Sequence, residues 1–357
     1  MNEYNEQLEK IEAELEQWLL ENMESGRIKE VLPGICPSAS QLGESGYKSQ
    51  ISAVSLDALF KPAKDMLSRG GKRWRPLLMT LVCESLGGGE ASLPLAPLVE
   101  FSHNASLIHD DIEDDSDERR GKPAIHKTYG VDTAINSGSF LYFLSLTCIE
   151  NCGMNDKHHI YKLWAECMRR LHLGQAMDIS WHKNISFIPG IDEYYTMCAL
   201  KTGCLSRFAA ELGVYAAHAP DEAAQQLSSA AEKVGIGFQI MDDVKNLTTG
   251  IPGKRLGDDL IEGKKSLPVL LYLHRYPEKR EQVFYTFHSA RANGAAAPEV
   301  KRLIQSLEAA GILAEATEKG KIFIKEAREI INSLEHHNLS INEKSRALLV
   351  GLIDKIS

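Results

Sequence analysis

The chain has 357 residues, 43% hydrophobic and 25% charged, which is typical of a globular protein with enough apolar material for a sizeable core. The formal net charge is −9, the pI is about 5.8, and no basic stripe is present. These values argue against nucleic acid as the main partner. They do not exclude an anionic substrate, because local cations or a metal can bind one.

The seven cysteines are scattered, without the paired spacing of a zinc site. The first 20 residues are acidic and lack the apolar core of a secretory signal, so reduced thiols and a cytoplasmic location are expected. The longest apolar run, near residues 140–149, is too short and too polar to cross a bilayer. We therefore expect no membrane span.

Residues 1–50 form a first segment of their own. Apolar positions recur with helical spacing over residues 4–23, which predicts an amphipathic helix that packs on the body of the protein or on a second subunit. Residues 24–50 hold Gly, Pro and Ser at short intervals and indicate an irregular connection. The remainder, residues 51–357, is expected to be a single domain.

Helical periodicity continues through that domain. It predicts helices at about 54–69, 76–86, 95–112, 129–150, 158–182, 192–217, 221–247 and 265–275, followed by further helical segments. No run of alternating β-branched residues is long enough to require a sheet. The expected fold class is all-α, a single-domain helical bundle with a central cavity.

An acidic cluster follows the apolar helix at 95–112. Asp110 and Asp114 are four residues apart and share a helix face, with Asp111 beside them. Carboxylates in this arrangement suit Mg²⁺, while the nearby Arg119 and Arg120 match phosphate oxygens. Taken alone, such a run is more often a solvated face.

A second acid pair, Asp242 and Asp243, again ends an apolar helical run and is followed by lysines. This repetition favours a metal-bridged diphosphate site over a solvated face. A basic segment, Lys72 to Arg75, precedes the helix opened by Pro76. Basic side chains at a helix start make a good anion site.

Several segments together resemble the trans-isoprenyl diphosphate synthases. The residues LIHDDIEDDSDERRGKPAIH resemble the first aspartate-rich motif of that family. The segments GGKRWRP, LHLGQAMDISW, ALKTG, FQIMDDVKN and GKRLGDDLIEGKKSLP resemble the others, in order, between about residues 60 and 270. The motif set is similar to that of the type III geranylgeranyl diphosphate synthases in particular, except at His109.

The resemblance implies a prenyltransferase that joins isopentenyl diphosphate to an allylic diphosphate, head to tail. About three Mg²⁺ ions would be ligated by Asp110, Asp114 and Asp242, with Asp111 and Asp243 assisting. The allylic diphosphate would contact a set of cationic and polar residues: Arg119, Lys201, Thr202, Gln239, Lys254 and Lys264. Lys201 and Thr202 would also lie near the carbocation, and the final proton would pass to the leaving diphosphate.

Isopentenyl diphosphate would need a separate, metal-free pocket, because it is the nucleophile and must not ionise. The resemblance implies that Lys72, Arg75, His103 and Arg120 form it. A lone histidine such as His103 is also often a structural hydrogen-bonding residue. The second motif reads D-D-x-x-N here, which weakens any metal-binding role for Asn246.

Product length would be set by residues along the growing prenyl chain. Ala105 and Ser106 are small, so the wall above the first motif would not stop the product at fifteen carbons. By the resemblance, Tyr142, Phe143 and His172 would form a floor and give a C20 product, geranylgeranyl diphosphate. If these three are ordinary core residues, the product would be a longer C25 to C50 polyprenyl diphosphate.

Two other functions share part of this pattern. A class I terpene cyclase would also use D-D-x-x-D but would need only one diphosphate site, whereas Lys72, Arg75 and Arg120 indicate two. A non-catalytic partner subunit would be expected to have lost one acid motif, and both are present here. The resemblance also implies a homodimer.

Overall fold

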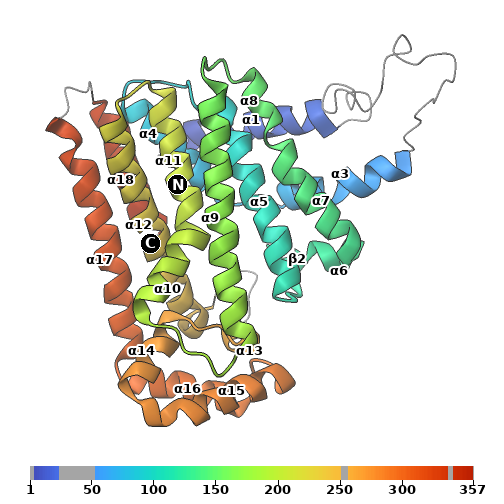
Figure 1. Ribbon diagram of the computed structural model, residues 1–357, viewed down its shortest axis with the longest axis vertical. Helices are drawn as coiled ribbons and strands as arrows, with labels where there is room; N and C mark the ends of the chain where they lie inside the picture. Colours follow the sequence, from blue (N-terminus) through green and yellow to red (C-terminus); the bar gives the residue numbers. More distant parts are fainter. Residues whose placement is uncertain (1–3, 24–52, 251–255, 337–340, 357) are drawn as a thin grey trace. The chain divides into compact units, whose positions relative to one another are not determined.

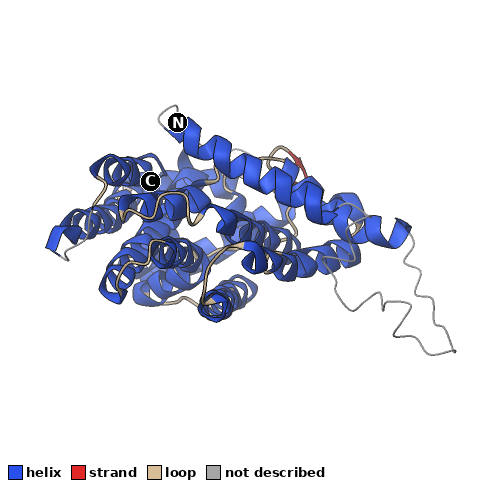
Figure 2. Ribbon diagram, turned by 90° about the horizontal axis from the view of Figure 1, so that it is seen from above, coloured by secondary structure: helices blue, strands red, loops and turns tan. Residues whose placement is uncertain are grey.

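The computed structural model describes residues 4–23, 53–250, 256–336 and 341–356. Helices make up almost all of it (Figure 2), which confirms the predicted all-α class. Among these residues the only strands are β1 (Glu118–Arg119) and β2 (Lys122–Pro123), which pair as one antiparallel hairpin. The described chain forms two compact units, residues 1–77 with 93–157 and residues 78–92 with 158–357.

The first unit is built around α5. Its helices are α1 (Asn5–Met23), α3 (Ala53–Ser68), the first turn of α4 (Trp74–Ser85), η2 (Leu93–Leu95), α5 (Ala96–Glu113), α6 (Ile125–Tyr129), α7 (Val131–Leu144) and α8 (Thr147–Asn151). Helix α5 contacts α1, α3, α6, α7 and α8, so it is the core element of this unit.

The predicted amphipathic helix over 4–23 is confirmed as α1, and it packs on the first unit. Ile11, Leu15 and Trp18 are buried, and the Trp18 ring meets Phe101 of α5 edge-on at a centroid distance of 5.0 Å. Burying one such side chain contributes about 1.5–3 kcal/mol. The connection predicted for residues 24–50 lies outside the described residues.

The single helix predicted over 129–150 is wrong, because the chain breaks twice there. Gly130 has a φ of +90°, which separates α6 from α7. After Leu144, the hydroxyls of Ser145 and Thr147 donate to the carbonyls of Tyr142 and Leu144, at 2.6 and 2.9 Å. Hydroxyl groups that bond back to the backbone favour such interruptions.

The second unit contains the longest helices. They are the rest of α4, α9 (Lys157–Lys183) from residue 158 onward, α10 (Ile191–Cys198), the π-helical η3 (Ala199–Gly203), α11 (Cys204–Ala216), α12 (Asp221–Thr248), α13 (Asp258–Glu262), α14 (Leu267–Arg275), η4 (Pro277–Lys279), α15 (Arg280–Asn293), α16 (Pro298–Ala309), α17 (Ile312–Asn332), η5 (Ser333–His336) and α18 (Glu343–Ile356). Helix α12 packs between α11 and α17 (Figure 1).

The helices predicted at 158–182 and 221–247 are confirmed within one residue at each end. The helix predicted at 192–217 contains the unforeseen π-helical turn η3 between α10 and α11. None of the described helices is long and apolar enough to cross a membrane.

Candidate active site

Three carboxylates end helix α5 in the first unit. Asp110 and Asp111 lie in its last turn, Asp114 is the C-cap, and that turn holds no basic residue. The C-terminus of a helix carries partial negative charge, so acidic residues there are unfavourable without a cation. The three carboxylates therefore repel the negative end of α5, and a bound cation would offset this repulsion.

A tight hairpin brings an arginine onto these acids. Arg120 and Gly121 connect β1 to β2 with φ values of +55° and +74°, as a two-residue type I′ turn requires. Arg119 then donates from Nε to Asp111 Oδ1 at 2.8 Å and from Nη2 to Asp110 Oδ2 at 3.4 Å. Arg119 thus offsets part of the charge of this cluster.

Asp111 is the most enclosed of the three acids. Burial raises the pKa of its carboxyl, although Arg119 acts in the opposite direction. Its Oδ2 is buried and has no hydrogen-bond partner in the described structure. A buried acceptor without a donor is costly, and a hard cation or its bound water would satisfy it. The residues present therefore fit Mg²⁺.

No group of three or more His, Cys, Asp and Glu side chains in the described ranges forms a ready-made metal cage. Mg²⁺ usually takes one or two carboxylates and fills its other positions with water and substrate phosphate oxygens. The first unit would accordingly supply carboxylates from Asp110, Asp111 and Asp114 and leave the remaining ligands to the substrate.

Arginines gather beside the acids, and most are paired. Arg69 bonds to Asp65, Arg73 to Glu12 and Glu100, and Arg119 to Asp110 and Asp111. Arg120 differs from them. It donates to the carbonyls of Gly70 and Met66, and among the residues described it forms no ion pair.

The electrostatic surroundings of Arg120 favour an anion. Burial lowers its pKa to about 10, and the positive charges of Arg73, Arg119 and Arg69 contribute to this shift against the opposing effect of Glu100. A half-buried guanidinium among other cations gains most from an added negative group. This corner of the first unit is therefore suited to a phosphate or diphosphate.

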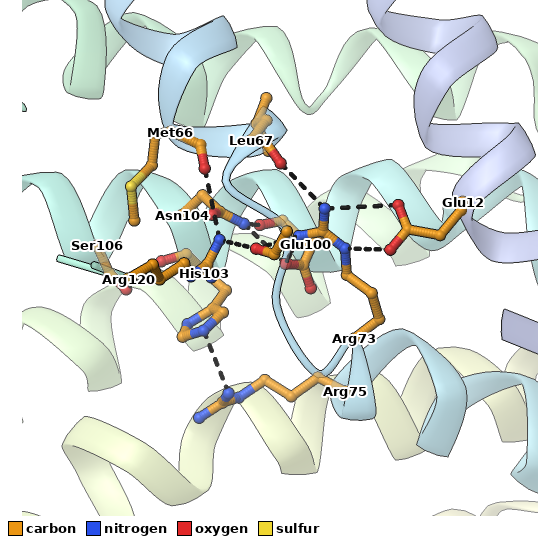
Figure 3. A network of polar contacts seen from close by, with 11 residues as sticks. Glu12, Met66, Leu67, Arg73, Arg75, Glu100, His103, Asn104, Ser106 and Arg120 are labelled. Atoms are coloured by element: carbon orange, nitrogen blue, oxygen red, sulfur yellow. Dashed lines mark hydrogen bonds and ion pairs between the residues drawn. The ribbon is translucent and has the colours of Figure 1, made fainter. Parts of the chain in front are cut away.

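Arg75 and His103, which are predicted to bind isopentenyl diphosphate together with Arg120, lie next to each other. His103 Nε2 is 3.4 Å from Arg75 Nη1, and because arginine can only donate, Nε2 must accept (Figure 3). Burial, followed by the charge of Arg75, holds the pKa of His103 well below its usual value. His103 is thus a neutral imidazole that orients Arg75. Lys72 is exposed on the loop before α4.

In the second unit, Lys201 and Thr202 lie on the π-helical turn η3. Such turns are rare and often occur at functional sites. A Cβ on Gly174 of α9 would be 2.4 Å from the Lys201 backbone nitrogen, and one on Gly235 of α12 would be 2.5 Å from Gly203 Cα. Two glycines thus let α9 and α12 approach η3 closely and fix its position.

Polar side chains continue from η3 into the second acid motif. Thr202 Oγ1 donates to Gln239 Oε1 at 2.9 Å, and Gln239 Nε2 donates to Asp243 Oδ1 at 3.0 Å. The other oxygen of Asp243 accepts from Tyr194 Oη at 2.7 Å and from the Leu267 backbone N–H at 2.9 Å. Predicted site residues Thr202, Gln239 and Asp243 therefore form one connected network.

Asp243 is a supporting residue by its geometry. It is buried, and its pKa is raised to about 7 by burial and then by Asp259, while its three donors oppose the shift. Asp242 is less buried than Asp243. Both oxygens of Asp243 are thus occupied by protein donors, and the metal-binding role of Asp242 stays a prediction.

Asn246 holds the segment that follows the second motif. Its Oδ1 accepts from the backbone N–H of Asp259 at 3.3 Å, and its carbonyl accepts from Gly257 at 2.9 Å. An amide performs this task without adding a charge beside Asp243 and Asp259. Lys264 pairs with Glu262 at 2.5 Å. Lys254, also predicted to bind diphosphate, lies outside the described residues.

The residues predicted to set chain length have different surroundings. Ala105 and Tyr142 are buried, Ser106 bonds to the His103 carbonyl, and the Tyr142 ring stacks on His109 at 5.6 Å. Phe143 is 63% exposed in the first unit. His172 is exposed on α9 of the second unit. Their role in product length stays a prediction.

The chain is similar to known proteins over most of its length. A family model described as polyprenyl synthetase matches residues 57–306. The chain belongs to the polyprenyl synthetase family. This family consists of prenyltransferases with a helical fold, and it is generally Mg²⁺-dependent.

Individual relatives extend the likeness. The chain is 37% identical over 231 residues to the short chain isoprenyl diphosphate synthase of Methanocaldococcus jannaschii, covering 63% of this chain and 69% of that relative. It is 31% identical over 320 residues to the geranylfarnesyl diphosphate synthase of Aeropyrum pernix, covering 87% and 97%. The solved geranylgeranyl pyrophosphate synthetase of Pyrococcus horikoshii gives a TM-score of 0.77 at 27% identity, covering 99% and 98%.

Sequence reasoning missed some residues that support the polyprenyl synthetase motifs. Asp178 Oδ2 pairs with Lys201 Nζ at 2.6 Å, and Tyr194 holds Asp243. Asp178 falls within the segment LHLGQAMDISW, so it carried a signal that could have been used. Tyr194 carried none, because it lies 49 positions from Asp243 and only packing brings the two together.

Proposed function

We propose that the protein is a Mg²⁺-dependent prenyl diphosphate synthase that condenses isopentenyl diphosphate with an allylic diphosphate. The observation that carries the proposal is Arg120, a half-buried cation with only carbonyl partners among other arginines. Next to it, α5 ends in carboxylates suited to a metal. A diphosphate beside a metal-bound diphosphate accounts for both features.

In this proposal isopentenyl diphosphate binds Lys72, Arg75, His103 and Arg120. His103 is neutral and accepts from Arg75, so it directs the Arg75 fork without adding charge. Arg120 supplies an unpaired positive charge. This set contains no carboxylate, so it would bind isopentenyl diphosphate without a protein-held metal, as the nucleophile requires.

The allylic diphosphate would contact Arg119, Lys201, Thr202, Gln239, Lys254 and Lys264. Asp110, Asp114 and Asp242 would ligate about three Mg²⁺ ions, with Asp111 and Asp243 in support. When bound, the metal stabilises the negative charge that develops on the leaving diphosphate. Asp178 holds the Lys201 ammonium in place, while Gln239 fixes the Thr202 hydroxyl, so no mobile nucleophile is left to trap the cation.

We further propose a C20 product, geranylgeranyl diphosphate. The support is Tyr142, which is bulky, buried and fixed against His109 on the helix that ends in the first motif. A C25 product is the main alternative, because one relative is named a geranylfarnesyl diphosphate synthase.

A homodimer and a cytoplasmic location also belong to this proposal. Helix α7 exposes Val131, Ile135 and Phe143, three large apolar side chains that a second copy would cover. All six cysteines of the described ranges are free and buried, as expected of a reducing compartment.

The test is a product assay with purified protein, Mg²⁺, isopentenyl diphosphate and one primer at a time (dimethylallyl, geranyl or farnesyl diphosphate). We expect elongation, with a C20 diphosphate dominant by mass spectrometry. Arg120→Gln should raise the KM for isopentenyl diphosphate, while Lys122→Gln, an exposed change in the same hairpin, should not. No elongation with any primer would refute the proposal in favour of a cyclase or a non-catalytic subunit.

A further inference from the structure

A buried ion network in the first unit lies beside the proposed isopentenyl diphosphate residues (Figure 3). Its centre is Arg73, which donates from Nε and Nη2 to Glu12 at 2.8 and 3.5 Å and from Nη1 to Glu100 at 2.7 Å. Nη1 also reaches the Gly70 carbonyl, and Nη2 the Leu67 carbonyl, at 3.3 and 3.0 Å. Every N–H of this guanidinium therefore has an acceptor.

The complete hydrogen bonding of Arg73 matters because the backbone around this residue has an unusual conformation. Gly70, Gly71 and Arg73 have φ values of +73°, +151° and +47°. An L side chain is strained in the left-handed region, so Arg73 needs support from its surroundings to stay there. The loop keeps this conformation because the Arg73 guanidinium is bound on one side by Glu12 of α1 and on the other by Glu100 of α5.

The anchored loop carries substrate-binding groups on either side. Lys72 immediately precedes Arg73, and Arg75 follows two positions later, with its guanidinium over the Trp74 ring at 4.3 Å. A change in the Arg73 backbone would therefore redirect both proposed diphosphate ligands.

Arg73 is also coupled to Arg120. Both guanidiniums donate to the same carbonyl oxygen, that of Gly70. A Cβ on Gly71 would lie 3.1 Å from Arg120 Nη2 and 3.4 Å from Arg73 Nη1, so the two arginines flank this glycine. Displacing Arg73 would therefore displace the guanidinium that lacks a carboxylate partner.

The α5 side of the network is buried, whereas the α1 side is partly exposed. Glu100 is buried, and Asn104 Nδ2 donates both to its Oε1 at 2.8 Å and to its carbonyl at 2.7 Å. The Glu12 side chain is 43% exposed. Glu12 is thus the part of the network that can be altered without opening the core.

We propose that Arg73, held by Glu12 of α1 and Glu100 of α5, is a positioning residue for the isopentenyl diphosphate half-site. Helix α1 is then a working part of that half-site and not only a packing element. This inference rests on the proposed function, since it names what fixes Lys72, Arg75 and Arg120 in that reaction.

Electrostatics alone would predict the opposite effect of removing Glu12. Deleting a negative charge near a cationic pocket makes the pocket more positive and should tighten diphosphate binding. Loss of positioning should weaken it instead, by about tenfold, because a small misplacement of binding groups is costly. The sign of the change therefore separates the two effects.

The experiment compares Glu12→Ala with Glu16→Ala, an exposed change one turn further along α1 that removes the same charge. Calorimetry would measure isopentenyl diphosphate binding without Mg²⁺, and steady-state assays would measure the KM for each substrate and kcat. For Glu12→Ala we expect about tenfold weaker binding and a matching rise in the KM for isopentenyl diphosphate, with kcat and the allylic KM within about twofold of wild type.

Arg73→Lys keeps the charge but not the five-donor fork, so it should show the same split. The double variant Glu12→Ala/Arg73→Lys should behave like Arg73→Lys alone, because both changes break the same contact between Arg73 and Glu12. Tighter binding in Glu12→Ala, or equal behaviour of the Glu12 and Glu16 variants, would overturn the inference. A wild-type protein that binds isopentenyl diphosphate but elongates no primer would refute the proposed function instead, and the binding comparison would still decide the role of Glu12.

Discussion

The hydroxyl of Tyr194 offers a sharp test of how the second acid motif is held. Tyr194 is buried, and its hydroxyl is one of three donors to the buried carboxylate of Asp243. Tyr194→Phe removes this donor and leaves the ring, so the packing is preserved. Above its pKa of about 7 the Asp243 carboxyl is charged. A hydrogen bond to a charged acceptor contributes about 1.5–3 kcal/mol, so at such a pH we expect a loss of that size in the free energy of unfolding.

The functional effect should appear in the metal dependence. Groups that orient a metal-binding carboxylate typically change metal affinity by about 10–100-fold when they are removed. We therefore expect the Mg²⁺ concentration for half-maximal activity to rise by about tenfold in Tyr194→Phe. The KM for isopentenyl diphosphate should stay unchanged, because Tyr194 donates to Asp243, which is not among the proposed ligands of that substrate.

The neighbouring residue supplies the control. Tyr195 packs its ring against Phe323, and the described structure shows no hydrogen bond from its hydroxyl. Tyr195→Phe removes the same atom one position along α10. Activity would be measured against Mg²⁺ concentration, and stability by urea unfolding without metal. If the two variants had the same Mg²⁺ dependence, the supporting role assigned to Tyr194 and Asp243 would be wrong.

Three further outcomes follow from the geometry. Gly174→Ala should lower kcat about tenfold or more, because its Cβ would lie 2.4 Å from the Lys201 backbone nitrogen, whereas Ser180→Ala on the exposed face of α9 should not. Burial and then Arg291 lower the pKa of Lys265 to about 8, so its charge destabilises the native state at pH 7. Lys265→Met should therefore raise the free energy of unfolding at pH 7 by about 1–2 kcal/mol. Lys301→Met, at an exposed position, is the control. That gain should shrink between pH 8 and 10.5, where the native state releases the Lys265 proton while the unfolded state still holds it, and a gain that grew with pH would contradict the assignment. Tyr142→Ala should shift the product beyond C20 by mass spectrometry, and an unchanged product would remove Tyr142 from the chain-length floor.

Local sequence was enough to predict most helices. Helices α9 and α12 begin and end within one residue of their predicted bounds, because their apolar periodicity is long and their ends are marked by polar or Pro-containing turns. The motif set likewise indicated the family, because each motif is a short contiguous segment and the order of the motifs along the chain can be seen in the sequence alone.

Other features depended on contacts between distant segments. Nothing around Ala199–Gly203 signals a π-helical turn, which arises where Gly174 and Gly235 allow α9 and α12 to approach. The exposure of Phe143 is similar, because an apolar residue in an apolar run is expected to be buried until its neighbours are known.

The sequence by itself determined the helical class, the positions of α9 and α12, and the two acid motifs with their trailing cations. Only the tertiary structure decided which cations are already neutralised and which are available. In the sequence, Arg73 and Arg120 are both cations close to a glycine. In the described part of the structure, Arg73 pairs with Glu12, 61 positions away, whereas Arg120 donates only to backbone carbonyls. The physical reason is that charge pairing depends on distance in space, and packing sets that distance.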